Sequence, residues 1–149
     1  MTKFIRDVLK NKGTSIVSVG PNETVYKALE LMAREDIGAL LVMNEGKVVG
    51  IMSERDYARK VILEGRSSLT ISVEKIMTKK VLYISPDNSV EEGLAQMSDK
   101  RCRHLPVFED GTLIGMVSIG DLVQAKVAET EFMLSQLEKL HSQWVSELD

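Results

Sequence analysis

Apolar and polar positions follow the same order twice along the chain. Residues 16–57 align without a gap on residues 81–122, which lie 65 positions later, and identical residues fall on strand cores, helix stripes and a turn glycine. Repetition at this length indicates two copies of one supersecondary unit, each too small to bury its apolar face alone. We therefore expect the copies to pack against each other. The identical pairs include Pro21 and Pro86, Val25 and Val90, Leu40 and Leu105, Gly46 and Gly111, Gly50 and Gly115, Ser53 and Ser118, and Asp56 and Asp121.

Within each copy, the spacing of apolar residues predicts the order β-α-β-β-α. Two short apolar runs separated by a Gly-containing turn are typical of a β-hairpin, and each copy contains one such pair. Apolar residues at i, i+4 and i+7 predict a helix after the first strand. The expected strands are 16–19, 39–43 and 48–53 in the first copy, and 81–84, 105–108 and 113–118 in the second.

The starts of the expected helices carry capping residues. Ser89 followed three residues later by Glu92 is a capping box, and Thr24 can cap the corresponding helix of the first copy. Two further helices are expected to begin near Asp56 and Asp121, and residues 65–69 form the expected loop between the copies.

The last helix is expected to continue well past the second copy, because neither Gly nor Pro interrupts it. Its apolar residues lie on one stripe that is long enough to need a partner surface. The stripe could fold back onto the core of the same chain or pair with another subunit, and we favour self-association. The residues of the stripe are Met133, Leu137, Leu140, Trp144 and Leu148.

Composition narrows the class of protein. A chain of 149 residues with 44% apolar composition can bury a core without a disulfide or a metal. The single cysteine, Cys102, and a charged amino terminus favour a reducing compartment, most simply the cytoplasm. The longest apolar run, residues 39–43, is far too short to span a bilayer, so no membrane partner is expected. A net charge of −3 with both signs interspersed makes a nucleic-acid polymer an unfavourable partner.

Each copy ends in a Ser-x-x-Asp sequence where a strand is followed by a helix, with Ser53 and Asp56 in the first copy and Ser118 and Asp121 in the second. The free amides of a helix start suit a phosphate, and an ionised Asp offers acceptors for two ribose hydroxyls. The same sequence is also an ordinary helix cap, with Ser accepting from a main-chain amide and Asp favouring the positive helix end. Spacing alone favours the cap, and both roles can coexist.

The residues around these sequences carry a family resemblance. The segments FIRDVL and VEKIMTKKV, the hairpins IGALLVMNEGKVVGIMSERD and CRHLPVFEDGTLIGMVSIGD, and the two-copy layout resemble a tandem pair of cystathionine-β-synthase (CBS) domains, a Bateman module. The resemblance covers the chain from Phe4 to about Ala128. More narrowly, SERDYARKV, RHLPV and SIGDLV resemble small stand-alone bacterial CBS-pair proteins.

The resemblance implies an α/β (α+β) fold in which two pseudo-symmetric β-α-β-β-α motifs pack sheet to sheet and a long carboxyl-terminal helix follows. The expected boundaries are residues 1–68 for the first motif, 69–128 for the second and 129–149 for the helix. Proteins of this kind commonly form dimers, so a homodimer is expected.

The resemblance also implies that adenine-containing nucleotides lie in clefts between the copies, with Asp on the ribose. Each cleft combines the Ser-x-x-Asp sequence of one copy with the strand start of the other. We expect the Asp121 cleft to bind more tightly, partly because Gly120 leaves the backbone open to a ligand. The residues expected at the Asp121 cleft are Thr14, Ser15, Ile16, Arg103, His104, Pro106, Ser118, Gly120 and Asp121. Those expected at the Asp56 cleft are Ser53, Arg55, Asp56, Thr78, Lys80 and Val81.

Plainer roles stay open for several of these residues. Arg55 and Lys80 are candidate phosphate partners, but a surface ion pair would explain them as well. Arg103 could be a surface charge, and His104 could be a strand residue with satisfied hydrogen bonds.

Catalytic and metal chemistry find little support in the sequence. Residues 115–120 have the glycine spacing of a phosphate-binding P-loop, but the next residue should be Lys and is Asp121. Cys102 and His104 share a strand face by period two, but no third group that would orient the base is evident. Two histidines and one cysteine are too few for a zinc site.

We therefore interpret the chain as a non-enzymatic regulatory module that binds AMP, ADP, ATP or NAD and senses the energy or redox state. Ligand binding would change the relative orientation of repeats or subunits, and an unidentified protein effector would respond to that change. The alternative is a ligand-free interaction scaffold that acts through dimerisation and the carboxyl-terminal helix.

Overall fold

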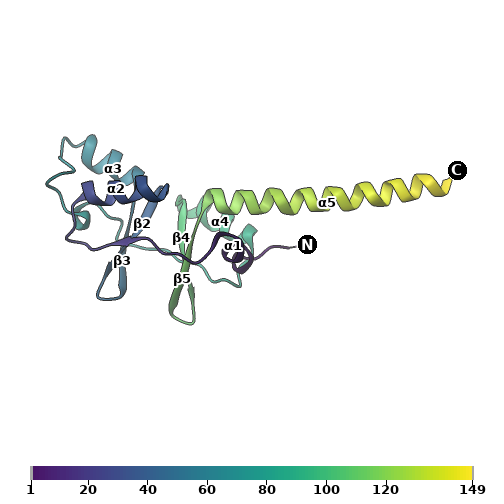
Figure 1. The fold of residues 1–149 in the computed structure, drawn as a ribbon, viewed down its shortest axis with the longest axis horizontal. Coiled ribbons are helices and arrows are strands. Elements are labelled where there is room, and N and C mark those ends of the chain that lie inside the picture. The colour runs from purple at the N-terminus through teal and green to yellow at the C-terminus, as the bar shows by residue number, and fades with distance from the viewer. Residues whose placement is uncertain (1, 149) are drawn as a thin grey trace. The chain divides into compact units, whose positions relative to one another are not determined.

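The computed structural model describes residues 2–148 and divides into two compact units (Figure 1). The first-copy unit is Ser15–Leu82. The second-copy unit combines the chain up to Thr14 with the chain from Tyr83 onward. Both units mix helices with a small sheet, as the repeat predicts. The units do not follow the expected motif boundary at residues 68 and 69, because each copy takes a short segment that precedes the other copy in sequence.

The first-copy unit is built on a three-stranded sheet. β1 (Ser18–Val19) pairs in parallel with β2 (Ala39–Asn44), which pairs antiparallel with β3 (Lys47–Ser53). The helical elements are α2 (Val25–Glu35), α3 (Glu54–Tyr57), the π-helical turn η1 (Ala58–Ile62) and the 3-10 turn η2 (Val73–Lys75). Residues 70–78 belong to this unit, and Thr78 exchanges main-chain hydrogen bonds of 2.8 and 3.0 Å with Ile51.

The second-copy unit repeats this plan with a two-stranded sheet. β4 (His104–Glu109) pairs antiparallel with β5 (Thr112–Ser118), and the other elements are α1 (Ile5–Lys12), α4 (Val90–Lys100) and α5 (Ile119–Leu148). The expected strand at 81–84 is reduced to one parallel bridge between Ile84 and Val107. In the first copy, the expected strand at 16–19 is likewise shortened to its last two residues.

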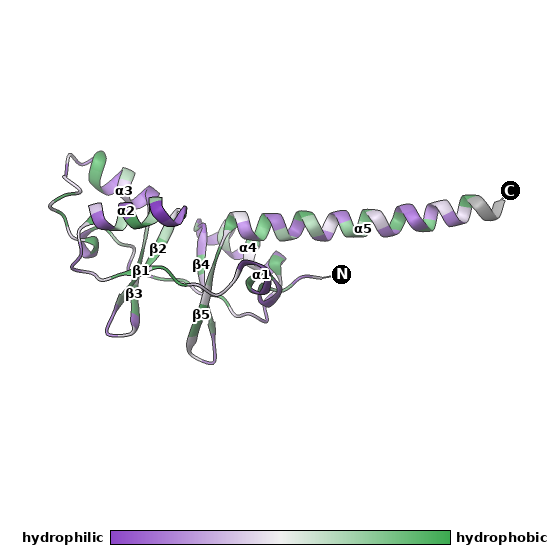
Figure 2. Cartoon of the chain, viewed as in Figure 1, coloured by the Kyte–Doolittle hydropathy of each residue, from purple (hydrophilic) through white to green (hydrophobic). Residues whose placement is uncertain are grey.

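The two hairpins confirm the turn prediction. Glu45 and Gly46 have positive φ angles of 51° and 79°, and Asp110 and Gly111 have 50° and 77°. Two consecutive residues with positive φ match the twist of antiparallel strands, which explains why Gly occupies the second position of both turns. The colouring in Figure 2 shows apolar residues along the paired strands of both hairpins.

The helix starts also match the sequence. Thr24 Oγ1 accepts a hydrogen bond of 3.2 Å from the Lys27 amide. At the start of α4, Ser89 accepts from the Glu92 amide at 3.0 Å, and Glu92 accepts from the Ser89 amide at 2.9 Å. This reciprocal pair satisfies two amides that the helix itself leaves free.

Helix α1 was not among the predicted elements, and it completes the core of the second-copy unit. The Ile5 side chain is fully buried, and Val8 and Leu9 are almost fully buried. A Cβ at Gly115 of β5 would lie only 2.8 Å from Leu9 Cδ2, so glycine lets the helix approach the sheet closely. The spacing of these three apolar residues follows the i, i+3, i+4 pattern of a helix.

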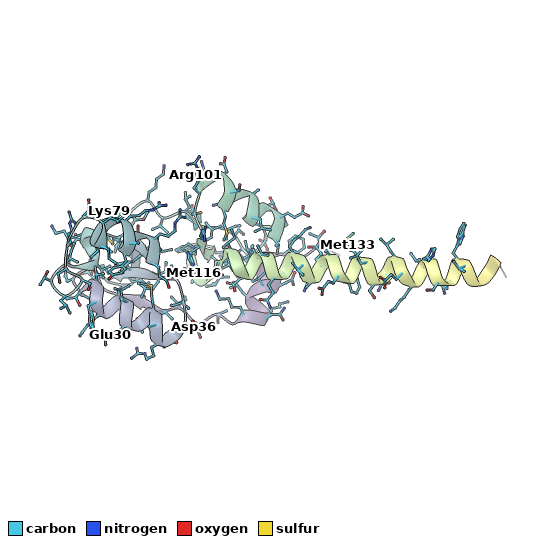
Figure 3. The ribbon with its side chains drawn as sticks, turned by 90° about the horizontal axis from the view of Figure 1, so that it is seen from above. Glu30, Asp36, Lys79, Arg101, Met116 and Met133 are labelled. Atoms are coloured by element: carbon cyan, nitrogen blue, oxygen red, sulfur yellow. The ribbon has the colours of Figure 1, made fainter. Side chains whose placement is uncertain are left out.

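Helix α5 belongs to the core only at its start. Leu122 is fully buried, whereas beyond it the helix continues without a break and its apolar side chains are largely exposed. Figure 3 shows that the part beyond Met133 stands apart from the other side chains of its unit. The Leu148 side chain, predicted for this stripe, lies outside the described residues. The exposed residues of the stripe are Met133, Leu137, Leu140 and Trp144, and Val127, Phe132 and Leu134 are exposed on other sides of the helix.

Replacing Ile5 by Ala tests whether α1 is part of the second-copy core. We expect the free energy of unfolding to fall by about 2–5 kcal/mol, because the change removes buried methyl groups and leaves a cavity. Chemical denaturation measures this value. Lys10→Ala on the exposed side of the same helix is the control and should change it by less than about 0.5 kcal/mol. Equal effects of the two variants would contradict the packing of α1.

Candidate functional site

The turn between β5 and α5 is held by Ser118 and Asp121. The Ser118 amide donates to Asp121 Oδ2 at 2.8 Å, and the Asp121 amide donates to Ser118 Oγ at 3.1 Å. This is the capping arrangement predicted as the plainer role of the Ser-x-x-Asp sequence. The cap uses one carboxylate oxygen of Asp121, and no described residue donates a hydrogen bond to the other oxygen, Oδ1.

Lys12, the last residue of α1, also contacts this turn. Its Nζ donates to Asp121 Oδ2 at 2.6 Å and to the main-chain oxygen of Met116 at 2.7 Å. The side chains of Lys12 and Asp121 remain 38% and 24% exposed, so water still reaches the pair. Lys12 therefore ties the end of α1 to both β5 and α5.

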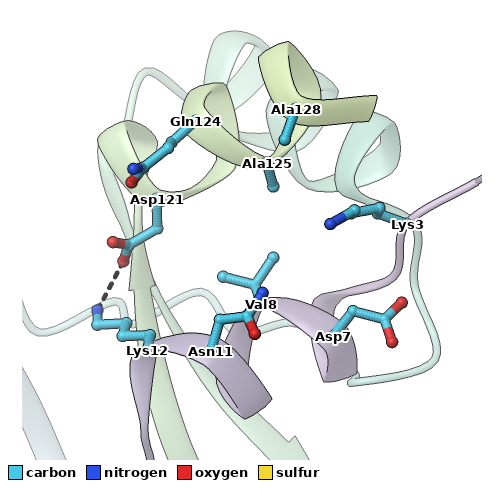
Figure 4. Close-up of a pocket in the computed structure, with 9 residues that line it drawn as sticks. All are labelled: Lys3, Asp7, Val8, Asn11, Lys12, Asp121, Gln124, Ala125 and Ala128. Carbon is cyan, nitrogen blue, oxygen red and sulfur yellow. Dashed lines mark hydrogen bonds and ion pairs between the residues drawn. The ribbon is translucent and has the colours of Figure 1, made fainter. Parts of the chain in front are cut away.

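A pocket of about 460 Å³ opens beside this ion pair, between α1 and α5 (Figure 4). Its volume lies in the range of small-molecule sites. Val8 of α1 faces Ala125 and Ala128 of α5 across the pocket; Lys3 points into it from one end, and the Lys12–Asp121 ion pair lies at the other end. The remaining lining residues are Asp7, Asn11, Asp121 and Gln124.

In the first-copy unit, the corresponding Asp56 is far more enclosed. Its Oδ2 accepts from the Ser53 amide at 3.0 Å and from the Ser53 hydroxyl at 3.1 Å. Its Oδ1 accepts from the Thr78 hydroxyl at 3.2 Å and pairs with Lys60 Nζ at 3.0 Å. Asp56 is only 9% exposed, and both of its oxygens are occupied by protein donors.

One residue in each copy accounts for much of this difference. Lys60 lies four residues after Asp56, so its ammonium group reaches back across one helical turn to Oδ1 and also donates to the Ile76 carbonyl at 2.9 Å. The position four residues after Asp121 is Ala125, which has no side chain long enough to do this. Ala125 instead lines the pocket, and Asp121 Oδ1 stays without a donor among the described residues.

Charge around the pocket affects two titratable groups. Partial burial alone would raise the pKa of Asp121, but hydrogen bonds from Lys12 and Ser118 outweigh it and hold that pKa below its usual value. Burial lowers the pKa of His104, and the positive charges of Lys12 and Arg103 lower it further while Asp121 opposes them. At neutral pH the carboxylate is therefore ionised and the imidazole neutral.

Of the other residues predicted for the Asp121 cleft, some lie beside the turn between β5 and α5 and one lies within the sheet. His104 begins β4 opposite Ser118, and the Arg103 carbonyl accepts from the Ile119 amide at 2.8 Å at the start of α5. Pro106 is buried, and its carbonyl accepts from the Ile84 amide, so it acts within the sheet. A Cβ at Gly120 would meet only Ser118 Oγ at 3.7 Å, which leaves space beside the backbone.

The strand start predicted for the Asp121 cleft is divided between the two units. Thr14 belongs to the second-copy unit, and Ser15 and Ile16 belong to the first-copy unit; all three are exposed. Their role in binding stays a prediction.

The residues predicted for the Asp56 cleft all lie in the first-copy unit, and the structure brings Thr78 onto Asp56. Arg55 and Lys80 are exposed, Val81 is half-buried, and neither cation forms an ion pair within residues 2–148. The cation that does reach Asp56 is Lys60, which sequence reasoning missed although its i, i+4 spacing was available. Lys12 was also missed, and no sequence signal links it to Asp121, because the two residues are 109 positions apart.

The described residues contain neither a cluster of metal-ligating side chains nor a helix that could cross a membrane. No group of three or more His, Cys, Asp or Glu side chains between residues 2 and 148 is placed to hold a metal ion. Among the same residues, none of the helices combines the length and the apolar character that a bilayer crossing needs.

Comparison with known proteins gives a consistent result. The family model of the CBS domain matches residues 5–63 and again residues 73–128. A mitochondrial CBS domain-containing protein of Arabidopsis thaliana, CBSX3, is 42% identical over 142 residues, which cover 89% of this chain and 69% of the plant protein.

Solved structures with the same fold extend the comparison. A CBS-domain protein from Burkholderia ambifaria is 48% identical with a TM-score of 0.82, and the match covers 85% of this chain and 95% of that chain. The CBS domain pair of protein MJ0100, solved with 5′-methylthioadenosine and S-adenosyl-L-methionine, has a TM-score of 0.76 at 23% identity, over 87% of this chain and 99% of that one. At this identity, the second likeness concerns the fold alone.

The lowered pKa of His104 predicts how stability depends on pH. The unfolded chain takes up a proton on this residue near pH 6.5, while the folded chain does so only at lower pH. The free energy of unfolding should therefore fall as pH drops below about 6.5, and denaturation at pH 7 and 5 measures this. The contribution of Asp121, whose folded pKa is also lowered, is lost only below its ordinary value of 3.8.

His104→Gln removes the titrating group and should reduce the loss of stability between pH 7 and 5. His141→Gln, on the exposed part of α5, is the control and should leave the loss unchanged. A His104→Gln variant with the full pH dependence of the unchanged protein would contradict the prediction.

Proposed function

The chain belongs to the CBS domain family, and from this premise we propose that it is a regulatory module that binds an adenine nucleotide beside Asp121. One observation carries the proposal: among the described residues, Asp121 keeps a carboxylate oxygen without a protein donor at the wall of a pocket, whereas both oxygens of Asp56 are occupied. A ligand at Asp56 would have to displace Thr78 or Lys60 first. We therefore assign the stronger binding site to the second-copy unit.

The chemistry of a ribose suits the open side of Asp121. Two neighbouring hydroxyl groups can donate to an ionised carboxylate, and its lowered pKa keeps Asp121 ionised at neutral pH. Hydrogen bonds to a charged group contribute about 1.5–3 kcal/mol each, so two of them supply a large part of a micromolar affinity, about 8 kcal/mol. The Ser118 cap uses Oδ2 and can persist while ribose occupies Oδ1.

A ligand at this position would contact three elements at once. The end of α1, the end of β5 and the start of α5 meet at Asp121 through Lys12, Met116 and Ser118. Binding shifts a conformational equilibrium only if one state binds the ligand better than the other. We propose that α1 and α5 are the elements whose positions respond and that a protein effector binds the favoured state.

We propose adenosine-containing ligands because the chain belongs to the CBS domain family. Both compounds in the MJ0100 complex contain adenosine, and they are ligands of that protein. For this chain, AMP, ADP, ATP and NAD are the proposed candidates, with no catalytic turnover. The cytoplasm remains the proposed location, although the Arabidopsis relative carries a mitochondrial name.

A second candidate function rests on α5. Its apolar stripe beyond Met133 is exposed, with Leu137 60%, Leu140 61% and Trp144 66% accessible. An isolated stripe of this length favours association with another helix. In this alternative, the protein is a scaffold that forms a homodimer through α5 and needs no ligand. The two functions are compatible, because the pocket at Asp121 and the stripe occupy different parts of α5.

Titration calorimetry with AMP, ADP, ATP and NAD tests the nucleotide proposal. We expect at least one of them to release or absorb heat on binding, and we expect Asp121→Ala to weaken that binding at least about tenfold because the ribose acceptors are lost. Asp99→Ala removes the same charge from the exposed side of α4 and should bind like the unchanged protein.

The Asp121→Ala variant also loses part of the α5 cap, so its folding must be checked. Circular dichroism should show that it is folded. A folded protein that gives no heat with all four nucleotides would contradict the proposal. Equal affinities of Asp121→Ala and Asp99→Ala would contradict the assignment to Asp121.

Sedimentation velocity tests the role of α5. The full chain should sediment as a dimer at micromolar concentration, and Leu137→Glu should shift it toward the monomer because a charge would be buried in the helix pair. Glu138→Gln, the next residue on the helix, is the matched control and should leave the dimer intact. A monomeric full chain, or a dimer that Leu137→Glu does not weaken, would contradict self-association through this stripe.

A further inference from the structure

Lys12 is placed to contact whatever approaches Asp121 from the pocket. Its ammonium group carries three N–H donors. Two of them are used, by Asp121 Oδ2 at 2.6 Å and by the Met116 carbonyl at 2.7 Å, and no third acceptor is found among the described residues. The same side chain lines the pocket beside Asp121, so its charge lies next to any molecule that binds at this carboxylate.

A ligand can replace the present acceptors of the Lys12 ammonium group. The Lys12 and Asp121 side chains are both partly exposed, and solvent weakens such a pair. Lys12 has a long, flexible side chain, and its ammonium group attracts any anion as a compact point charge. A phosphate carries more charge than a carboxylate and offers several acceptor oxygens, so it can take over this ammonium group.

We propose that Lys12 is a phosphate-binding residue that Asp121 holds in place until a nucleotide arrives. This proposal rests on the proposed function, because it assumes that the ribose binds at Asp121. When the ribose hydroxyls occupy the carboxylate, the ammonium group turns to the phosphate of the same nucleotide. The site consequently selects phosphorylated adenosine over adenosine itself, which can bind Asp121 Oδ1 but has no phosphate for Lys12 to bind.

The exchange also gives α1 a way to respond to the ligand. In the structure, Lys12 links the end of α1 to Met116 of β5 and to Asp121 of α5. Transfer of Lys12 to a phosphate breaks at least one of these links. The end of α1 then moves only with a phosphorylated ligand and not with adenosine.

A purely structural role for Lys12 makes a different prediction. Lys at the last residue of a helix is favourable by itself, because it lies at the negative end of the helix dipole. If Lys12 only fixed α1 against β5, its loss would disturb the pocket and weaken phosphorylated and unphosphorylated ligands alike. The ratio of the two affinities therefore separates the roles.

The test compares AMP, ADP, ATP and adenosine binding to the full chain with Lys12→Gln, by calorimetry and by NMR shift titration for weak binding. Gln keeps much of the side-chain length and can still donate to the Met116 carbonyl, but it carries no charge. We expect nucleotide binding to weaken about tenfold, as for a lost charge-assisted contact. Adenosine binding should stay the same, because adenosine has no phosphate that Lys12 could bind.

Two further variants complete the experiment. Lys10→Gln removes the same charge from the exposed side of α1 and should leave every affinity unchanged. Lys12→Arg keeps the positive charge and should retain the preference for nucleotides over adenosine. The ratio of AMP to adenosine affinity in each variant is the deciding value.

The outcomes distinguish this inference from the function on which it rests. No binding of any nucleotide by the unchanged protein would overturn the proposed function and the inference together. Nucleotide binding that is equally strong in Lys12→Gln and Lys10→Gln would overturn the role of Lys12 alone. The same would follow if AMP and adenosine lost affinity by equal factors, or if the unchanged protein bound both equally well.

Discussion

The structure depends on the exchange of short apolar segments between the two repeats. Each compact unit combines the small sheet of one repeat with the segment that precedes the other repeat in sequence. Ile5 and Leu9 of α1 fill the second-copy core, while Val73 and Ile76 fill the first-copy core. Burial of these side chains places Lys12 beside Asp121 and Thr78 beside Asp56. The polar sites are therefore consequences of core packing.

The two copies of one unit differ in the donors that surround their aspartates, and Thr78 and Lys60 both contact Asp56 Oδ1. Lys60 helps to close the carboxylate of Asp56, whereas Ala125 at the equivalent position leaves the carboxylate of Asp121 open toward a pocket. The aspartates have the same capping role at the start of their helices, with Ser53 and Ser118 as reciprocal partners. A buried, fully bonded carboxylate stabilises its turn, whereas an oxygen without a protein donor is available to a ligand. Asymmetry within the repeat is thus the physical basis for assigning one preferred site.

Much of the fold could be predicted from the sequence, because the signals are local. Hairpins follow from apolar runs around Gly46 and Gly111, and the helix starts follow from Thr24 and Ser89. The 65-residue repeat also indicates two related units. Helix α1 has the apolar spacing of a helix. It was not predicted because the amino-terminal segment was interpreted by its charged residues. The first strand of each copy is shorter than predicted, because an apolar run does not show how many of its residues pair with a neighbouring strand.

The site was less predictable than the fold, because its decisive contacts join distant residues. Asp121 could be identified from its place at a strand-to-helix turn, and Lys60 could have been found from helical spacing. Lys12 reaches Asp121 only through the packing of α1, and the sequence offers no pattern for that approach. The most direct test of the account is a crystal structure of the protein grown with AMP. The account predicts ribose hydroxyls on the Asp121 carboxylate. Density for AMP elsewhere, with Asp121 still held only by Ser118 and Lys12, would contradict it.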